Sequence, residues 1–255
     1  MRHVLVFAAI AIGSACTGAE EPATSAAPQG AATAPRVDTS RAGTVSGTVV
    51  FEGTPPAETP PKVSRDQYCV RASASGLPAE SYVITDGKLE NVVVYIKEGL
   101  GKYQYDPPTQ TAKLDQEGCR YRPHGLAVRV GQPIEISNSD ETLHNVHAIP
   151  RVNQEFNFGQ AIKGMKDTRS FTAPEVGITF RCDVHPWMTS YVSVFDHPYF
   201  AVTADGGKFT LKDVPPGTYT LEAWHERLGR QTQQITLGDK EARQITFTFK
   251  PAALP

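Results

Sequence analysis

The sequence predicts an all-β protein. Glycine and proline are frequent, with 21 and 20 copies among 255 residues, and short runs rich in Val, Thr, Phe and Tyr recur through most of the chain. Turn residues (Gly, Asn, Asp and Pro) separate these runs, and closely spaced strands joined by such turns are typical of a β-sandwich or barrel. The formal net charge of −2, with no basic block, argues against a nucleic-acid partner.

The N-terminus has the features of a secretory signal, which we assign to residues 1–16. Arg2 and His3 precede the apolar run 4–12, which is much shorter than the about 20 residues that a membrane-spanning helix needs. Small residues then lead to Cys16, a pattern similar to the bacterial lipoprotein box, in which the cysteine is lipidated. Gly13 stands where that box usually has Leu, so ordinary signal cleavage is the alternative. Both interpretations predict export, to the periplasm or to a lipid tether at the outer membrane.

Residues 17–42 separate this signal from the folded part. They contain no aromatic residue and a single Val, so they cannot bury enough apolar surface to offset their chain entropy. We expect a disordered tether.

Strands are expected throughout the remainder. The first is predicted at 44–51, and a buried strand is predicted at 91–97 (NVVVYIK), which is apolar almost throughout. Residues 65–87 are expected to be mostly loop, with a short extended piece at 81–85, and residues 101–118 are polar and turn-rich. Further strands are predicted at 119–123, 126–130, 134–138, 145–149, 168–172, 178–182, 190–195, 200–203, 208–211, 218–224, 231–237 and 243–249.

The two ends of this region resemble one known module. The stretch ADGGKFTLKDVPPGTYTLEAW resembles the second half of the carboxypeptidase regulatory-like, or transthyretin-like, sandwich, and GTVSGTVVFEGTPP resembles its opening strand. The resemblance implies that residues 43–100 and 197–250 form one sandwich, with residues 101–196 inserted and 251–255 as a tail. Such an insertion is physically easy because domain termini usually lie close together. Two tandem domains are the alternative.

Metal-ligating residue types are concentrated in the stretch CDVHPWM at 182–188. Cys182, His185 and Met188 are each separated by two residues. Because side chains alternate along a strand, Cys182 is expected to share a core face with Ile178 and Phe180. Thiolate, imidazole and thioether suit a soft or borderline metal, and copper accepts all three, whereas zinc has little use for a thioether.

The blue-copper arrangement of two His, one Cys and a weak axial Met needs a second histidine. His144 and His147 are three residues apart, so on an extended strand they point to opposite faces. His144 shares its face with Val146 and Ala148, an apolar set suited to the core. We therefore choose His144 as the fourth ligand and expect His147 at the surface or behind the ligands.

The stretches LHNVHAIP and CDVHPWM resemble the ligand loops of the cupredoxins, and the short spacing of the second is of the amicyanin type. The resemblance implies a Greek-key β-sandwich for this part of the chain, binding one type 1 copper that alternates between Cu(I) and Cu(II). It implies that the copper ligands are His144, Cys182, His185 and Met188. It also implies that Asn145, directly after the first histidine, ties the two ligand loops together by hydrogen bonds.

Four protein ligands leave no coordination position open for a substrate, so we expect electron transfer and no enzymatic activity. We expect the ring edge of His185 to reach the surface, with Pro186 and Trp187 forming an apolar rim where a redox partner docks. A c-type cytochrome or a periplasmic dehydrogenase would suit this role. The alternatives are copper storage, delivery or sensing, and an envelope interaction module with a structural metal site.

The cysteine count bears on the redox state. Beyond Cys16 the chain has three cysteines, an odd number. Cys182 has ligand-type neighbours, whereas Cys69 and Cys119 lie in polar stretches without them. We therefore expect a Cys69–Cys119 disulfide, which an oxidising compartment would allow. Two free buried thiols are the alternative.

Overall fold

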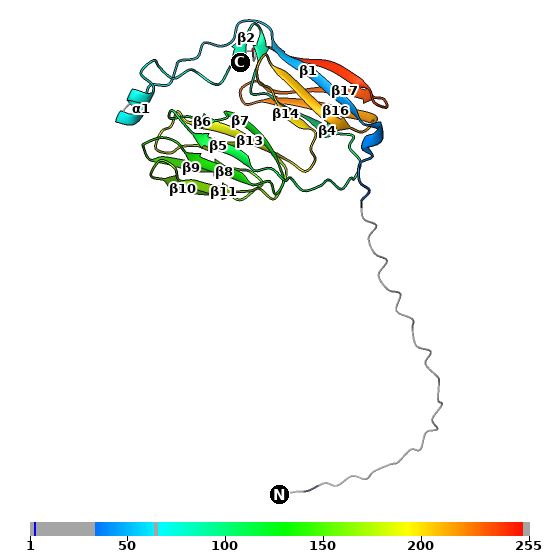
Figure 1. Cartoon of the computed structure of the whole chain (residues 1–255), viewed down its shortest axis with the longest axis horizontal. Coiled ribbons are helices and arrows are strands. Elements are labelled where there is room, and N and C mark those ends of the chain that lie inside the picture. The colour runs from blue at the N-terminus through cyan, green and yellow to red at the C-terminus, as the bar shows by residue number, and fades with distance from the viewer. Residues whose placement is uncertain (1–2, 4–33, 64–65, 252–255) are drawn as a thin grey trace. The chain divides into compact units, whose positions relative to one another are not determined.

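The structure is a computed structural model of the chain and describes residue 3, residues 34–63 and residues 66–251. Almost all of the predicted signal, including Cys16, and most of the predicted tether lie outside the described residues. Within the described part, strands dominate, and helix is limited to the short 3-10 helix η1 (Thr39–Arg41) and to α1 (Gln67–Ala72) (Figure 1). The prediction of an all-β protein is confirmed. No helix of this part is long and apolar enough to span a membrane.

Strands from both ends of the folded region form two sheets that share one core (Figure 1). The first sheet has the order β15-β1-β3-β2, with β18 parallel to β1, and the second has the order β14-β4-β16-β17. The strands are β1 (Gly43–Phe51), β2 (Ile84–Thr85), β3 (Lys88–Leu89), β4 (Val93–Glu98), β14 (Phe200–Val202), β15 (Lys208–Val214), β16 (Gly217–His225), β17 (Gly229–Leu237) and β18 (Ala242–Phe249). Strands that precede residue 101 therefore pair with strands that follow residue 196.

The position of β4 explains its apolar sequence. Val94 and Ile96 face the core between these two sheets. Val93 and Tyr95 face the opposite side, where they pack against Phe195 in a second cluster. A strand that is covered on both faces has no polar face to alternate with, hence the continuous run NVVVYIK.

The middle of the chain forms two more sheets around a core of their own. One has the order β10-β9-β12-β13-β7 and the other the order β11-β8-β5-β6. The strands are β5 (Ala112–Gln116), β6 (Tyr121–Arg122), β7 (Gly125–Arg129), β8 (Ile134–Asn138), β9 (His144–Ile149), β10 (Phe156–Gln160), β11 (Lys166–Arg169), β12 (Glu175–Arg181) and β13 (Thr189–Phe195). All of them pair only with each other among the described strands.

Several elements differ from the sequence-based expectation. The polar stretch 101–118 contains β5, which is held by its parallel pairing with β8, and β10 was not expected beside β9. The predicted loop 65–87 contains α1, a helix of six residues whose N-cap Asp66 accepts a hydrogen bond from the Cys69 amide. Such short elements lack a periodic pattern of their own and depend on tertiary contacts.

Residues 34–42, the end of the predicted tether, contact the folded part. Arg36 forms an isolated bridge with Gln104 and an ion pair with Asp106 at 2.9 Å. Arg41 forms an ion pair with Asp239 at 2.7 Å. These contacts fix the chain where it enters β1.

Candidate metal centre

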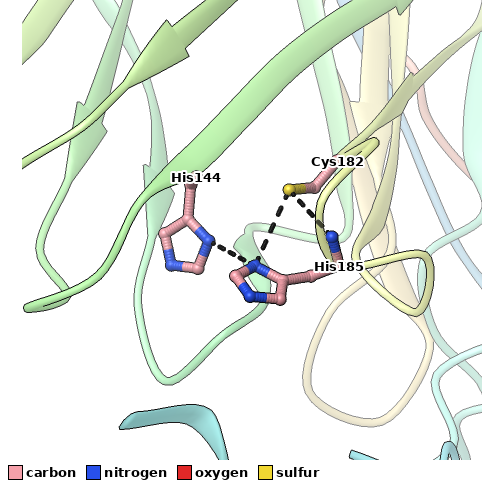
Figure 2. A group of neighbouring side chains, drawn as sticks. All are labelled: His144, Cys182 and His185. Carbon is pink, nitrogen blue, oxygen red and sulfur yellow. Dashed lines mark hydrogen bonds between the residues drawn. The ribbon is translucent and has the colours of Figure 1, made fainter. Parts of the chain in front are cut away.

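His144, Cys182 and His185 meet at one end of the middle sheets. His144 is the first residue of β9, Cys182 directly follows β12, and His185 lies on the loop between β12 and β13. One ligand atom of each residue lies within 4.8 Å of those of the other two. Figure 2 shows the two imidazole rings turned toward each other, with the Cys182 sulfur beside them.

Strand alternation brings His144 and Cys182 to the same side. β12 pairs with β9 so that Phe180 faces Ala148, and Phe180, Cys182 and His144 are all essentially buried. The Cys182 sulfur accepts backbone hydrogen bonds from the Asn145 and His185 amides, each at 3.3 Å. These N–H groups stabilise a negatively charged sulfur.

Each histidine directs its Nε2 atom at hydrogen-bond acceptors. His144 Nε2 lies 2.9 Å from a carboxylate oxygen of Asp140. His185 Nε2 lies 3.4 Å from a carboxylate oxygen of Asp66 and 3.8 Å from the Cys69 sulfur. Carboxylates and disulfide sulfurs carry no proton to donate, so the proton of each neutral imidazole belongs on Nε2.

This tautomer leaves a lone pair on each Nδ1. The two Nδ1 atoms lie 3.0 Å apart, and the Nδ1 of His185 lies 3.8 Å from the Cys182 sulfur. Three electron-pair donors therefore point into one small space, where they would repel each other without a proton or a cation between them. Two imidazoles and a thiolate fit copper, for which the blue-copper plane has this composition.

The charges around the site favour a thiolate. Burial alone would raise the pKa of Cys182. In the copper-free site, hydrogen bonds from His144 and His185 when an imidazole also carries an Nδ1 proton, together with those from the two amides, lower it to about 6. Burial likewise opposes protonation of His144, yet the Asp140 hydrogen bond and the sulfur raise the pKa of this histidine above its ordinary value. This lowered pKa favours the ionised form of Cys182, which is the form that binds metals.

Met188 lies beside this group. Its side chain is buried in the same core cluster as Cys182. Its carbonyl accepts a hydrogen bond from the Cys182 amide at 3.2 Å, and its own amide donates to the His185 carbonyl at 2.9 Å. The loop 182–188 is therefore a tight turn that returns Met188 to the side of Cys182.

Asn145 connects the segment of His144 to the segment of Cys182. Its side-chain oxygen accepts a hydrogen bond from the Asp183 amide at 2.8 Å, next to Cys182. Its amide group donates to Asn157 and to the Phe158 carbonyl. The Tyr121 hydroxyl lies 2.6 Å from the Asn145 carbonyl and holds the same corner from the other sheet.

The expectation that the ring edge of His185 reaches the surface is wrong. His185 is 2% exposed, although Val184 before it is 47% exposed and Pro186 after it is also exposed. The cover is α1 with its preceding residue Asp66, a segment that the sequence did not place near the site. Trp187 remains half-buried, with its ring centroid 5.1 Å from that of His185.

His147 lies outside the group of three. Its Nδ1 contacts a carboxylate oxygen of Asp183 at 3.0 Å and its Nε2 contacts Glu155 at 2.7 Å. It points away from the face of His144, as strand alternation predicts. His147 is therefore part of a polar cluster beside the ligand loop.

The structure contains a disulfide between Cys69 and Cys119 and leaves Cys182 as a free, buried cysteine. The disulfide joins α1 to the turn between β5 and β6. Besides this bond, the Tyr68 hydroxyl donates to Asp140 at 3.0 Å, and the Thr142 hydroxyl donates to Asp66 at 2.6 Å.

Sequence reasoning missed Asp66 and Asp140 as partners of His185 and His144. Asp140 could have been found, because it precedes His144 by four residues in the turn that ends at β9. The Asp140 carboxylate also accepts hydrogen bonds from the Gly118 and Cys119 amides of the turn between β5 and β6, at 2.8 and 2.7 Å. Asp66 carries no such signal, since its contact with His185 arises only from the folded path of the chain.

Comparisons with known proteins give partial matches. The profile of a family described as polysaccharide lyase family 4, domain II, matches residues 172–244. A comparison with curated proteins finds no match. Among solved structures, a mutant of amicyanin with Cu(I) is 24% identical over 33% of this chain and 81% of that chain, with a TM-score of 0.30.

Two other solved copper proteins are similar to part of the chain. The purple cupredoxin from Nitrosopumilus maritimus is 23% identical over 32% of this chain and 98% of that chain, with a TM-score of 0.29. The Cu-containing nitrite reductase from Thermus scotoductus SA-01 is 17% identical over 58% of this chain and 28% of that chain, with a TM-score of 0.33. These matches are distant, so the assignment of the site depends on its own geometry.

Proposed function

We propose that the chain is an exported type 1 copper protein that carries single electrons between redox partners of the cell envelope. The observation that supports this most strongly is the convergence of the Cys182 sulfur with the Nδ1 atoms of His144 and His185, while both Nε2 atoms face acceptors. Met188 is the proposed axial ligand. Bound copper would supply one-electron exchange between Cu(I) and Cu(II).

The burial of the donors supports electron transfer over copper delivery. His144, Cys182 and His185 are 0%, 1% and 2% exposed. Delivery or sensing would require a partner to replace these ligands one after another, and such replacement needs access to the metal. Electron transfer needs no such access, and fixed ligands let the metal change charge with little movement. Four protein ligands also leave no open position for a substrate, which argues against an enzyme.

The spectrum of the copper-loaded protein tests this proposal. We expect an intense thiolate-to-copper charge-transfer band that Cys182→Ser abolishes, and reversible cycling between the two oxidation states. Met188→Leu should change the spectrum and the reduction potential. Met165→Leu serves as the matched control, because Met165 lies outside the site. A copper-loaded protein without the charge-transfer band would refute the proposal.

We further propose that a redox partner, such as a c-type cytochrome or a periplasmic dehydrogenase, docks at the rim formed by Val184, Pro186 and Trp187. His185 is covered, so a partner would have to exchange electrons through a neighbouring group. Trp187 is the aromatic residue of this rim, and its ring contacts that of His185. Trp187→Glu should slow electron transfer to the partner, while Val152→Glu, at another exposed apolar position, should not. Equal rates for both variants would refute this docking site.

The disulfide favours the proposed location, since such bonds persist in oxidising compartments such as the periplasm. Attachment to the outer membrane through a lipidated Cys16 is part of the same proposal and is tested by mass spectrometry of the mature N-terminus. We also propose that the sheets built from both chain ends are one regulatory-like sandwich that carries the metal-binding part as an insertion. The pairing of β1 with β15 and β18 supports this organisation.

A further inference from the structure

His185 is buried although its loop lies at the surface. Its neighbours Val184 and Pro186 are exposed, so the ring owes its burial to residues from elsewhere in the chain. Two such residues contact the ring at Nε2, namely Asp66 at 3.4 Å and Cys69 at 3.8 Å. Both belong to α1 or its N-cap, and we call the segment 66–72 the cap of the site.

The carboxylate of Asp66 is held in place by two groups. One of its oxygens accepts the Cys69 amide proton at 2.9 Å, which is the N-cap bond of α1. The other accepts the Thr142 hydroxyl proton at 2.6 Å, and this same oxygen faces His185 Nε2. Thr142 lies two residues before the ligand His144, so Asp66 links both ligand segments to the cap.

A carboxylate at this place acts on the ring through its position and its charge. As a negative charge 3.4 Å from Nε2, it favours the tautomer with the proton on that nitrogen, which directs the Nδ1 lone pair toward Cys182. As a fixed, partly buried negative charge, it stabilises the state with the higher positive charge. Removal of the charge should therefore favour Cu(I) over Cu(II).

We propose that Asp66 is a positioning residue that fixes the orientation and tautomer of His185 for copper and biases the site toward Cu(II). This inference rests on the proposed function, since it concerns the same site. It goes beyond that function because it assigns a role to a residue outside the ligand loops. The alternative is that Asp66 only caps α1.

Two variants separate these roles. Asp66→Asn removes the charge but keeps the size of the side chain. It also keeps the helix cap, because Asn caps helices as well as Asp does. Asp66→Ser also keeps a capping oxygen but is too short to reach His185. Asp183→Asn is the control, because it removes one negative charge from the residue next to Cys182 without touching either imidazole of the site.

The ratio of Cu(II) to Cu(I) affinity, obtained from the reduction potential, should fall by about tenfold in Asp66→Ser, which loses the partner behind a ligand. It should also fall in Asp66→Asn, which loses the charge. Asp183→Asn should change it by much less. The inference is overturned if the Asp66 variants keep the ratio of the wild type, or if Asp183→Asn shifts it as far as they do.

A second measurement uses the copper-free protein and separates this inference from the proposed function. The ¹⁵N signals of His185 in the wild type should show the tautomer with the proton on Nε2. In Asp66→Ser a measurable share of the molecules should have the proton on Nδ1 instead. An unchanged share overturns the positioning role even if copper binds. An altered share together with an absent charge-transfer band in the wild type would refute only the copper assignment.

Discussion

Removal of the Cys69–Cys119 disulfide should destabilise the protein by several kcal/mol. The bond closes a loop with a sequence separation of 50 residues. The chain-entropy relation gives about 14 cal/mol/K for the denatured chain of that loop, or about 4 kcal/mol at 25 °C. We expect the double variant Cys69→Ala, Cys119→Ala to lose roughly this amount of unfolding free energy.

The native fold should survive the change. The hydrogen bonds from Tyr68 to Asp140 and from Thr142 to Asp66 still hold the cap against the ligand segments. Both cysteines are fully buried, so alanine is preferred to serine, which would bury two hydroxyl groups. The single variant Cys182→Ala is the matched control, since it removes a buried sulfur that belongs to no disulfide.

Urea unfolding of the copper-free protein measures this loss. The chain has two tryptophans, Trp187 and Trp224, and the indole of Trp187 donates to the Cys119 carbonyl at 3.1 Å. In a Trp224→Phe background, the fluorescence of Trp187 therefore reports on the region of the disulfide. Reduced wild type should match the double variant. A loss below about 1 kcal/mol would refute the loop-entropy reasoning.

Three further predictions concern other sites. In the copper-free protein, the ultraviolet absorbance of the Cys182 thiolate should appear with a midpoint near the lowered pKa of about 6, and a midpoint near that of an ordinary thiol would contradict this. Burial, helped by two neighbouring positive charges, lowers the pKa of His225 to about 4. Because the unfolded chain then binds a proton that the folded chain does not, the unfolding free energy should fall between about pH 6.5 and pH 4, by at most about 3 kcal/mol. Urea titrations at several pH values across that window measure this fall in unfolding free energy, and His225→Gln should show a smaller fall. Gly177→Ala should cost about 1–3 kcal/mol in the same titrations, since its Cβ would collide with Trp224 at a positive φ of 75°. The control Gly131→Ala has the same φ with no atom within 4 Å and should cost less.

The sequence predicted the parts of the site that depend on local geometry. Alternation along extended strands placed Cys182 on the core face and separated His144 from His147. In the structure Cys182 is buried in the core, and His147 contacts Asp183 and Glu155 instead of the group of His144. The two-residue spacings of CDVHPWM could be interpreted because the loop is a tight turn closed by its own backbone hydrogen bonds. Such relations involve residues a few positions apart, so the pattern of the sequence contains them.

The cap could not be predicted in this way, because it depends on contacts between distant residues. Its bonds join Tyr68 to Asp140 and Asp66 to Thr142, which are 72 and 76 residues apart in the sequence. The helix α1 itself has only six residues and no apolar periodicity. The burial of His185 follows from these contacts, which is why the loop sequence alone predicted an exposed ring.

The cap also changes the expected path of an electron. If a partner cannot touch the ring of His185, an electron must cross at least one further group between that ring and the surface. Trp187 meets the requirement from the rim side, because its half-buried ring contacts His185 and its neighbour Pro186 is exposed. The disulfide meets it from the cap side, because Cys69 contacts His185 Nε2 and Cys119 accepts the indole proton of Trp187. Both routes converge on Trp187, so under the proposed function this residue, rather than the ligand itself, should govern the rate of exchange with a partner.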